Sequence, residues 1–513
     1  MNDVSNPART PADNPVSAAD LSAFDAIIVG SGPNGLAAAI RLAQAGRSVC
    51  VLEAASTPGG GVRSAELTLP GFIHDVCSSV YPMAACSPFL RTLPLAKHGL
   101  QWITPPIALA HPLDDASAQQ SPSQQSSSQQ SRAAVLHNSL DDTVANLGPD
   151  GPAYRNLVGQ FVARSQDFFA DALSQPGIPH HPLMMANFGL RALRSAASLA
   201  RATFKTERAR GLFAGIAAHS ILPLEMAGTS APALVLAIAA HVAGWPIARG
   251  GSQQLANAMV SHLESLGGKV ITNCMVESLD QLNPQTQSQP GKDKLILFDV
   301  TPRQLIKITG SAMPASFKLS LNKFKHGMAV YKVDWALKEP VPWRSKQCRL
   351  AGTIHLGATL DEICASERRA WNSQPPERPY VLFAQPSLFD PTRAPAGQHT
   401  AWAYCHVPYG YTGNATQMIE DQIERFAPGF KDCILARSVM GPADLEAHNP
   451  NLIGGDIGGG AATLKQLLVR PTTRLWRTPM SNIYLCSSST PPGPGVHGMC
   501  GYQAAEKALA DHS

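Results

Sequence analysis

Charge is scarce in this chain of 513 residues, and the two signs nearly balance. Charged residues make up 15% of the sequence, and the formal net charge is only +4 at pH 7. Proteins that bind nucleic acid usually carry dense basic surfaces, so the composition predicts no nucleic-acid partner. Hydrophobic residues make up 44%, which is ample for a large core, and the length predicts more than one domain.

Regularly spaced cysteines are also missing. The ten cysteines are scattered, and none of them forms a C-x-x-C pair. This pattern argues against a zinc site and against a disulfide framework, and it is typical of proteins in reducing compartments. We therefore predict a cytoplasmic protein with no bound metal.

Two segments lack the apolar residues that a folded core needs. Residues 1–22 have no apolar run like that of a signal peptide, and we expect a disordered N-terminal segment. Residues 116–132 consist mainly of Ser and Gln. We expect this low-complexity insertion to extend a surface turn without a catalytic role.

The most informative stretch that is present starts near residue 24. Residues 25–29 are mostly apolar and predict a buried parallel strand, and a G-x-G-x-x-G turn follows at once. An Ala-rich helix over 35–46 leads into a second strand at 48–52, and Glu53 comes directly after it. Strand, glycines, helix, strand and acid in this order predict a dinucleotide-binding unit.

Each part of this unit has a mechanical role. Gly30 permits the tight turn, Gly32 lets the backbone approach a pyrophosphate, and Gly35 lets the helix pack closely on the strand. The helix N-terminus offers N–H groups to the phosphates. The Glu53 carboxylate is placed to accept hydrogen bonds from ribose hydroxyls and would repel a 2′-phosphate, which argues against NADP. The cofactor residues predicted here are Gly30, Ser31, Gly32, Asn34, Gly35 and Glu53.

A second glycine cluster favours FAD over NAD. Residues 59–61 are all glycine, and Arg63 follows them. Gly60 and Gly61 would let the backbone approach the middle of a ligand larger than NAD. Arg63 would neutralise pyrophosphate charge or face the flavin edge.

The combined pattern resembles a known family. Glu53, the glycine pair, Ser64 and the segment GFIHDVCSSVYPMAACSPFLR at 71–91 resemble the phytoene desaturase-like flavoproteins, also called the carotenoid/retinoid oxidoreductase family. This family lies within the amine oxidase-type FAD superfamily. The greatest resemblance is to the branch of pyridine nucleotide-disulfide oxidoreductase domain-containing protein 2. The resemblance extends over most of the chain, with further matching segments at 250–270, 341–363, 449–460 and 491–509.

This resemblance implies further cofactor contacts. The backbone of Val276 would hold the adenine edge. A second G-x-G-x-x-G at 493–498 would be the C-terminal flavin motif, with a helix over 501–511 directing its N-terminus at the flavin. The residues implied there are Ser488, Gly495 and Val496. Ser487 stands where the family has Gly, and prolines at 491, 492 and 494 replace a more Gly-rich run.

The implied fold is α/β, with a Rossmann-like FAD-binding domain and an inserted α+β substrate domain. The cofactor domain is expected over 23–110, 245–310 and 440–511, and the substrate domain over 111–244 and 311–439. Tyr331, Trp343 and His355 could line a substrate pocket, but ordinary core and rim positions are favoured. No catalytic side chain can be named; His74 and His497 are the best guesses, each with a structural role favoured.

Two stretches of the sequence are candidates for contact with a membrane. Residues 188–211 hold six cations and one Glu at helical apolar spacing, which predicts either a basic helix that docks on an anionic membrane or a solvated helix face. Residues 226–248 contain no charge, but Pro232, Gly244 and Pro246 favour a buried substrate-domain helix over a membrane span.

These observations predict an FAD-dependent oxidoreductase that removes hydride from a C–H bond of a largely apolar substrate, such as a polyene. Electrons would pass to O₂ or a quinone. One alternative is an amine oxidase-type flavoenzyme, which needs aromatic rings beside the flavin, and aromatics are only 6% here. Another is a flavoprotein that acts as a regulatory partner. The absence of a redox cysteine pair after the first glycine motif argues against a disulfide reductase.

Overall fold

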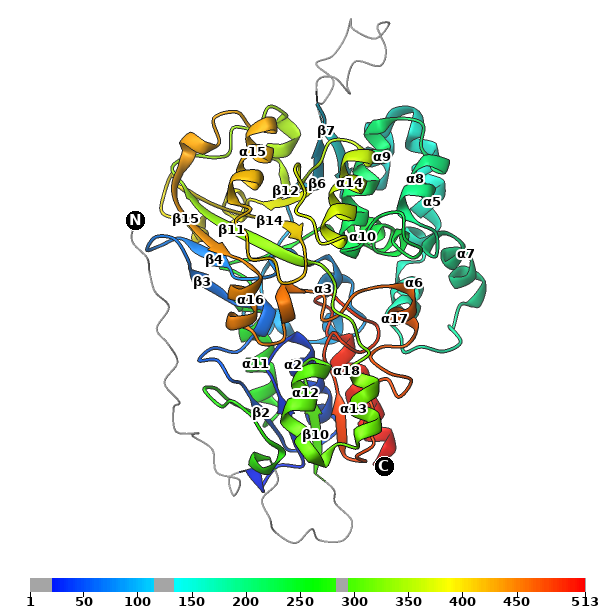
Figure 1. Ribbon diagram of the computed structural model, residues 1–513, viewed down its shortest axis with the longest axis vertical. Helices are drawn as coiled ribbons and strands as arrows, with labels where there is room; N and C mark the ends of the chain where they lie inside the picture. Colours follow the sequence, from blue (N-terminus) through cyan, green and yellow to red (C-terminus); the bar gives the residue numbers. More distant parts are fainter. Residues whose placement is uncertain (1–20, 115–132, 283–293, 513) are drawn as a thin grey trace, which may run out of the picture.

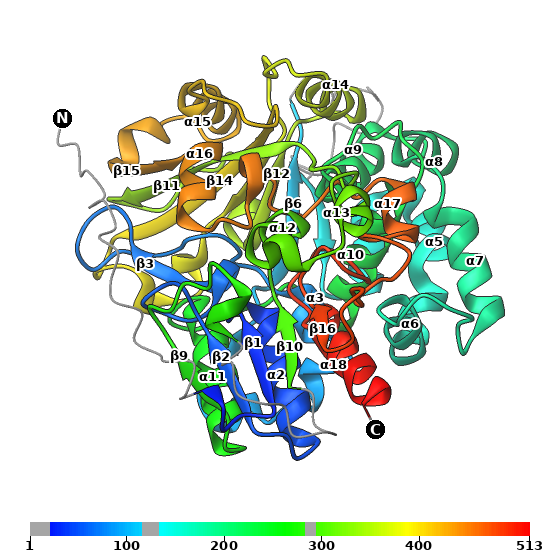
Figure 2. The same cartoon turned by 60° about the horizontal axis from the view of Figure 1, so that its bottom comes forward.

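Two β-sheets organise the molecule, as the computed structural model shows (Figure 1). The structure describes residues 21–114, 133–282 and 294–512. Residues 1–20 and the predicted insertion at 116–132 lie outside this part of the chain. A five-stranded sheet occupies one end of the molecule, and a seven-stranded sheet with a group of helices beside it occupies the other (Figures 1 and 2).

The five-stranded sheet is parallel throughout and contains the first glycine motif. Its order is β16-β10-β1-β2-β9, with bounds Ala26–Val29 (β1), Val49–Leu52 (β2), Lys269–Ile271 (β9), Leu295–Phe298 (β10) and Ile483–Leu485 (β16). Helices α2 (Pro33–Gln44), α11 (Gln253–Ser265) and α18 (Met499–Asp511) cover one face, and α12 (Pro302–Thr309) and α13 (Ala315–Leu321) the other. Both faces are apolar because the sheet is buried on both sides. The two predicted strands and the helix between them therefore form as expected, to within two residues at each end.

The seven-stranded sheet runs β15-β11-β14-β13-β12-β6-β7 and is antiparallel except where β12 meets β6. Its strands are Ile107–Pro112 (β6), Ala133–His137 (β7), Ala329–Leu337 (β11), Ala351–Leu356 (β12), Val381–Ala384 (β13), His399–Val407 (β14) and Ile434–Met440 (β15). Helix α15 (Thr416–Phe426) packs on one face. The opposite face packs against helices and borders the candidate site.

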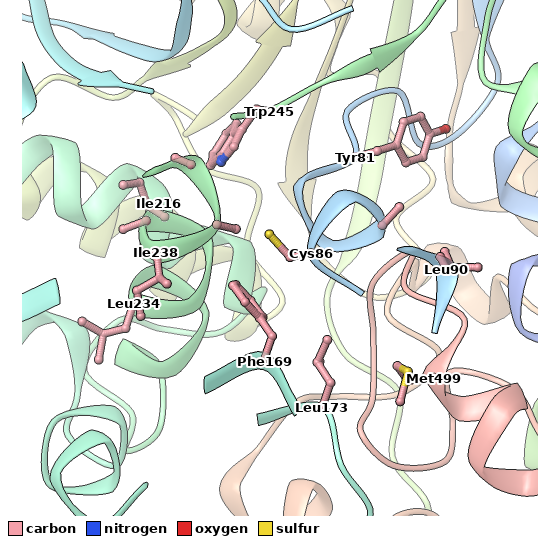
Figure 3. Packing of buried hydrophobic residues seen from close by; sticks show 14 of the residues in the cluster. Tyr81, Cys86, Leu90, Phe169, Leu173, Ile216, Leu234, Ile238, Trp245 and Met499 are labelled. Atoms are coloured by element: carbon pink, nitrogen blue, oxygen red, sulfur yellow. The ribbon is translucent and has the colours of Figure 1, made fainter. Parts of the chain in front are cut away.

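Those helices form most of the right-hand side of the molecule in Figure 1. They are Leu140–Leu147 (α4), Gly151–Ala163 (α5), Ser165–Ala172 (α6), Pro182–Ala192 (α7), Ala196–Thr203 (α8), Glu207–Ala217 (α9), Ser230–Ala243 (α10) and Leu360–Trp371 (α14). Figure 3 shows Ile216 of α9 and Leu234 and Ile238 of α10 opposite Cys86, the last residue of α3 (Pro82–Cys86). One continuous apolar core thus joins this group to the five-stranded sheet.

Short elements complete the frame. Two-stranded ribbons pair β3 (Ser64–Glu66) with β4 (Ile73–Asp75) and β5 (Trp102–Ile103) with β8 (Ile247–Ala248). Helices α16 (Pro442–His448) and α17 (Leu464–Leu468) precede β16.

The prediction of one basic amphipathic helix over 188–211 is wrong. The stretch is divided among the end of α7, all of α8 and the start of α9. Ser195 and Thr206 each cap a new helix, since their side chains accept hydrogen bonds from the amides of Ser198 and Ala209. Most of the cations are also engaged: Arg201 pairs with Asp361, Arg208 donates to Asn146, and Arg210 pairs with Glu207.

The prediction for 226–248 is confirmed, since the stretch contains the mostly buried helix α10. Within the described ranges, no helix combines the length and the apolar character that crossing a membrane requires.

A buried ion pair links the β3–β4 ribbon to the segment that precedes β14 of the seven-stranded sheet. Arg393, just before β14, places Nη2 2.7 Å from Oδ2 of Asp75 at the end of β4, and neither side chain is appreciably exposed. Burial works to raise the pKa of the Asp75 carboxyl, but Arg393 and hydrogen bonds from Ser79 and Ser252 outweigh it and hold that pKa below its ordinary value. Such a pair fixes geometry more than it adds stability.

The two ends of the chain meet at a backbone contact between α2 and α18. A Cβ atom added to Gly501 would lie only 1.7 Å from the carbonyl oxygen of Asn34. Only glycine permits this approach. It holds the N-terminal glycine turn beside the C-terminal one.

Gly501→Ala should therefore destabilise the protein by about 3 kcal/mol, the upper part of the range for overpacking, because its new methyl group meets backbone that cannot rotate away. Gly189→Ala in α7 is the matched control, since a Cβ there meets nothing within 4 Å. It should be neutral or stabilising by up to ~1 kcal/mol. Equal melting temperatures for the two variants in calorimetry would contradict the contact.

Candidate functional site

The first glycine turn is shaped by close backbone contacts. Gly30 has φ +100° and donates its amide to the Leu52 carbonyl (2.8 Å), which locks the turn to β2. A Cβ on Gly35 would lie 2.1 Å from the Gly30 carbonyl oxygen, and one on Gly32 would lie 2.6 Å from Oδ2 of Asp299. The turn therefore requires all three glycines, as the sequence pattern predicts.

Glu53 braces this turn from the end of β2. Its Oε2 accepts hydrogen bonds from the Ser31 amide (3.0 Å) and hydroxyl (2.5 Å), and its Oε1 accepts from the Ala55 amide (2.8 Å). The side chain is 7% exposed. The carboxylate thus lies at the rim of the turn, where an acid that contacts a ribose would have to be.

The second glycine cluster lies directly against the first. A Cβ on Gly60 would be 3.1 Å from the Cα of Gly32. Arg63 donates from Nε to the Gly60 carbonyl (3.0 Å), which fixes its largely buried side chain beside the cluster. The two glycine segments therefore form one wall.

That wall encloses one end of a cavity of about 1440 Å³. All predicted cofactor residues except Gly35 line it: Gly30, Ser31, Gly32, Asn34, Glu53, Gly60, Gly61, Arg63, Val276, Ser488, Gly495 and Val496. Gly35 packs behind the turn. Residues from the beginning, middle and end of the chain thus meet around one space, which exceeds the usual size for a single small ligand.

The C-terminal motif tolerates its departures from the family pattern. The Ser487 hydroxyl donates to the Val300 carbonyl (2.7 Å), so the side chain turns back toward β10 and fits where the family has Gly. His497 accepts the Met499 amide at Nδ1 (3.0 Å), and burial lowers the pKa of His497 to about 4. This neutral ring caps the start of α18, which agrees with the structural role favoured for it.

His74, the other histidine singled out in the sequence, also has a structural position. It is 1% exposed, and its Nε2 lies 2.8 Å from the Thr68 hydroxyl. Its Nδ1 is 3.5 Å from Asp334 Oδ1. Tyr331, Trp343 and His355 are likewise buried and do not line the cavity, as the favoured interpretation predicts.

Asp299 is a cavity residue that sequence reasoning missed. It follows β10 directly, and its Oδ2 accepts the amide of Gly35 (2.9 Å) beneath the first glycine turn. Burial raises the pKa of Asp299 to about 7, helped by the nearby Glu53 carboxylate, although the Gly35 amide opposes the shift. The sequence did contain a signal for this residue, because Asp299 is an acid that directly follows the apolar run 295–298. Since β10 lies beside β1 in the parallel sheet, an acid at the carboxyl end of β10 lies next to the first glycine turn.

Two buried ionic side chains shape the loop beside the C-terminal motif. Asp456 accepts amides of Gly327 (2.9 Å), Gly458 (2.8 Å) and Gly460 (2.9 Å). Arg470, fully buried, donates to the carbonyls of Gly458 (3.0 Å) and Ser488 (2.9 Å), and burial lowers its pKa to about 10. The loop's glycines thus hold their shape as part of the cavity wall.

The other half of the cavity is largely apolar. Helices α7 and α10 contribute Met185, Phe188, Ala231, Val235 and Leu236, and Trp245 follows α10. The seven-stranded sheet adds a few polar groups. Lys332 of β11 contacts Asp334 and lies 5.6 Å from the Trp402 ring, which stacks on Tyr404 at 6.0 Å.

Comparison with known proteins agrees with this arrangement. The family model described as NAD(P)-binding Rossmann-like domain matches residues 28–92. Pyridine nucleotide-disulfide oxidoreductase domain-containing protein 2 of Mus musculus is 24% identical, with 95% of this chain and 94% of that protein covered. A lycopene-forming phytoene desaturase of Paracoccus sp. is 23% identical, covering 94% of this chain and 96% of that enzyme.

The chain is thus similar along most of its length to oxidoreductases of the phytoene desaturase-like family. The predicted resemblance is thereby confirmed. Solved structures share the fold: an oxidoreductase of Methanosarcina mazei has TM-score 0.61 at 14% identity, with 94% of this chain and 99% of that chain covered. Putrescine oxidase has TM-score 0.56 at 16% identity, with 95% and 99% covered. The chain therefore shares its α/β fold with these solved oxidoreductases.

The partly buried Asp299 should make stability depend on pH. Its folded-state pKa lies above the unfolded value of about 3.9, so the stability that its protonated form contributes is complete below about pH 4 and is lost as the pH rises through about 7. Asp299→Asn keeps an acceptor for the Gly35 amide and removes the titration. The free energy of unfolding of the variant should rise relative to that of the parent from pH 4 to pH 7, by at most about 4 kcal/mol, and reach a plateau above pH 7. Asp280→Asn, at an exposed site, is the control, and a parallel pH profile for all three proteins would refute the assignment.

Proposed function

We propose that this protein is an FAD-dependent oxidoreductase that removes hydride from a C–H bond of a largely apolar substrate. The observation that carries the proposal is the single cavity, polar and glycine-lined at one end and apolar at the other. The five-stranded sheet would hold the cofactor, and the seven-stranded sheet with its helices would hold the substrate. Bound FAD would supply hydride acceptance and would pass electrons to O₂ or a quinone.

The cofactor end fits a dinucleotide larger than NAD. Gly32 and Gly60 approach so closely that only backbone faces the ligand there. Oδ1 of Asn34 and Oγ1 of Thr301 are buried, line the cavity, and have no hydrogen-bond partner in the described part of the chain. Such atoms call for a ligand. Glu53 would bind ribose, Arg63 the pyrophosphate or flavin edge, the Val276 backbone adenine, and Ser488, Gly495 and Val496 the flavin side.

The substrate end needs few reactive side chains. Its apolar walls would orient the substrate carbon toward the cofactor and exclude water. Of the charged residues around it, Asp171 already accepts the amides of His180 and His181, and Lys332 contacts Asp334. Neither of these two charges is therefore free to bind an ionic substrate.

An amine oxidase-type activity is the second candidate. The stacked rings of Trp402 and Tyr404 beside the cavity favour it, because such enzymes need aromatic rings near the flavin. Anaerobic bleaching of the flavin by a long-chain alkylamine and not by an apolar C–H donor would favour this candidate. Bleaching by neither, with FAD bound, would favour a regulatory flavoprotein.

Membrane contact would let an apolar substrate reach the cavity. On α7, Leu183 and Leu190 are 87% and 76% exposed, while the cavity-lining Phe188 is 9% exposed. Leu468 of α17, also a cavity residue, is 67% exposed. The Gly228 amide donates to the Leu193 carbonyl (3.0 Å), which links the end of α7 to a turn that lies against α17. We propose that these exposed leucines, with Arg194 and Lys465 nearby in sequence, dock on an anionic bilayer.

Glu53→Ala should lose FAD. A hydrogen bond to a charged group contributes about 1.5–3 kcal/mol, which corresponds to roughly tenfold to a hundredfold weaker binding. Wild-type protein should be yellow and release FAD on denaturation, and an apolar C–H donor should bleach it anaerobically without NADPH. The exposed Glu264→Ala is the control and should keep full colour. Colourless wild-type protein after refolding with FAD, or rapid reduction by NADPH alone, would overturn the proposal.

The double variant Leu183→Ser and Leu190→Ser should lose membrane binding. Wild type should float with liposomes containing anionic phospholipid at low salt and less so at high salt, because screening weakens the cationic contribution. Leu350→Ser, at a half-exposed leucine outside these helices, should float like wild type. Absence of flotation by wild type at low salt would end the idea.

A further inference from the structure

Two polar groups on the substrate side of the cavity have no protein partner. Tyr404 of β14 and His219, which follows α9, both line the cavity and are only partly buried. Neither the Tyr404 hydroxyl nor Nδ1 of His219 has a hydrogen-bond partner among the residues that the structure describes. These two groups are hydrogen-bonding positions on a largely apolar part of the wall, which Ser220, Thr353 and Trp402 also line.

Sheet register places the two groups at neighbouring positions. Tyr404 pairs with Leu382, and Leu382 pairs with His355, so the three side chains share one face of the sheet. Nε2 of His355 lies 3.1 Å from Nε2 of His219, which fixes His219 above that end of the row. Adjacent strands are about 4.8 Å apart, and the cavity-lining Leu382 lies between Tyr404 and His355 in this row.

The imidazole contact also determines which atom His219 presents. In a hydrogen bond between two neutral imidazoles one nitrogen donates and the other accepts, which sets both tautomers. Nδ1 of His355 is buried without a partner in the described ranges. A bare buried acceptor costs less than a bare buried N–H, so His355 donates from Nε2. His219 then carries its proton on Nδ1 and offers a donor to the cavity.

Both groups stay neutral donors near pH 7. Burial lowers the pKa of His219 to about 3, and burial raises the pKa of the Tyr404 hydroxyl well above its ordinary value. Lys332 pairs with Tyr404 across β11 and β14, and it is the nearest charged residue in register. Both groups are thus donors, and the Glu367 carboxylate, which also acts to raise the Tyr404 pKa, pairs with His406.

We propose that the substrate is an apolar molecule carrying one carbonyl oxygen, which accepts hydrogen bonds from the Tyr404 hydroxyl and from Nδ1 of His219. The inference rests on the proposed function, since it takes the apolar half of the cavity as the substrate site. A pure hydrocarbon would bury both donors unsatisfied, and a site built for hydrogen bonds discriminates strongly against a ligand that lacks the acceptor.

Equilibrium dialysis of radiolabelled probes against the FAD-loaded protein tests this. 2-Heptadecanone supplies the acceptor, and heptadecane matches its length. Wild type should bind the ketone at least tenfold more tightly. Tyr404→Phe should weaken ketone binding about tenfold and leave heptadecane unchanged, because only the hydroxyl is lost. His219→Leu should act in the same way, and His219→Asn, which keeps an N–H near the Nδ1 position, should retain most of the affinity.

Tyr154→Phe is the matched control, because its hydroxyl contacts His241 outside the cavity. It should bind both probes like wild type. Equal affinity of wild type for ketone and alkane would overturn the inference, as would a Tyr404→Phe variant that weakens both probes alike. A separate measurement of FAD content distinguishes failure of this inference from failure of the proposed function. If the protein contains no FAD but still prefers the ketone, the carbonyl site is supported and the proposed cofactor is contradicted.

Discussion

The contact of Gly501 with the Asn34 carbonyl is the constraint on which the rest of the site depends. It joins α2 to α18, and with them the first and last glycine motifs of the chain. The loop clamped by Asp456 and Arg470 then has a fixed wall to pack against. A larger residue at this crossing would separate the two motifs and open the cavity between them.

Local patterns in the sequence predict the cofactor end of the fold well. The run from residue 25 to Glu53 contains strand, turn, helix and acid in unbroken order. Each predicted element therefore limits the conformation that the following segment can adopt. The separation into two sheets was expected only through the family resemblance, because the strands of each sheet come from distant segments. Asp299 shows the limit: its contact with Gly35 spans 264 residues, and no local rule pairs them.

The error at 188–211 has an equally local cause. Apolar spacing continues across Ser195 and Thr206, but each of these residues starts a new helix by capping it. Ser and Thr are both good N-cap residues. The sequence therefore did indicate two new helix starts, but the continuous apolar spacing favoured a single helix. The substrate-side groups were harder to find. Tyr404 and His219 come from different elements, and only the register of three strands and one imidazole contact brings them together.

Because the cavity wall is assembled from the first strand, the middle of the chain and the loop that precedes the last helix, it does not exist until these segments have folded together. Any molecule held there binds the native state alone and shifts the folding equilibrium by mass action. Occupancy then reports on complete folding: a nascent chain that lacks the C-terminal loop at 487–497 has all of the first glycine turn but not the completed wall. For a coloured cofactor, the visible spectrum of a preparation would report the fraction of molecules that are correctly folded.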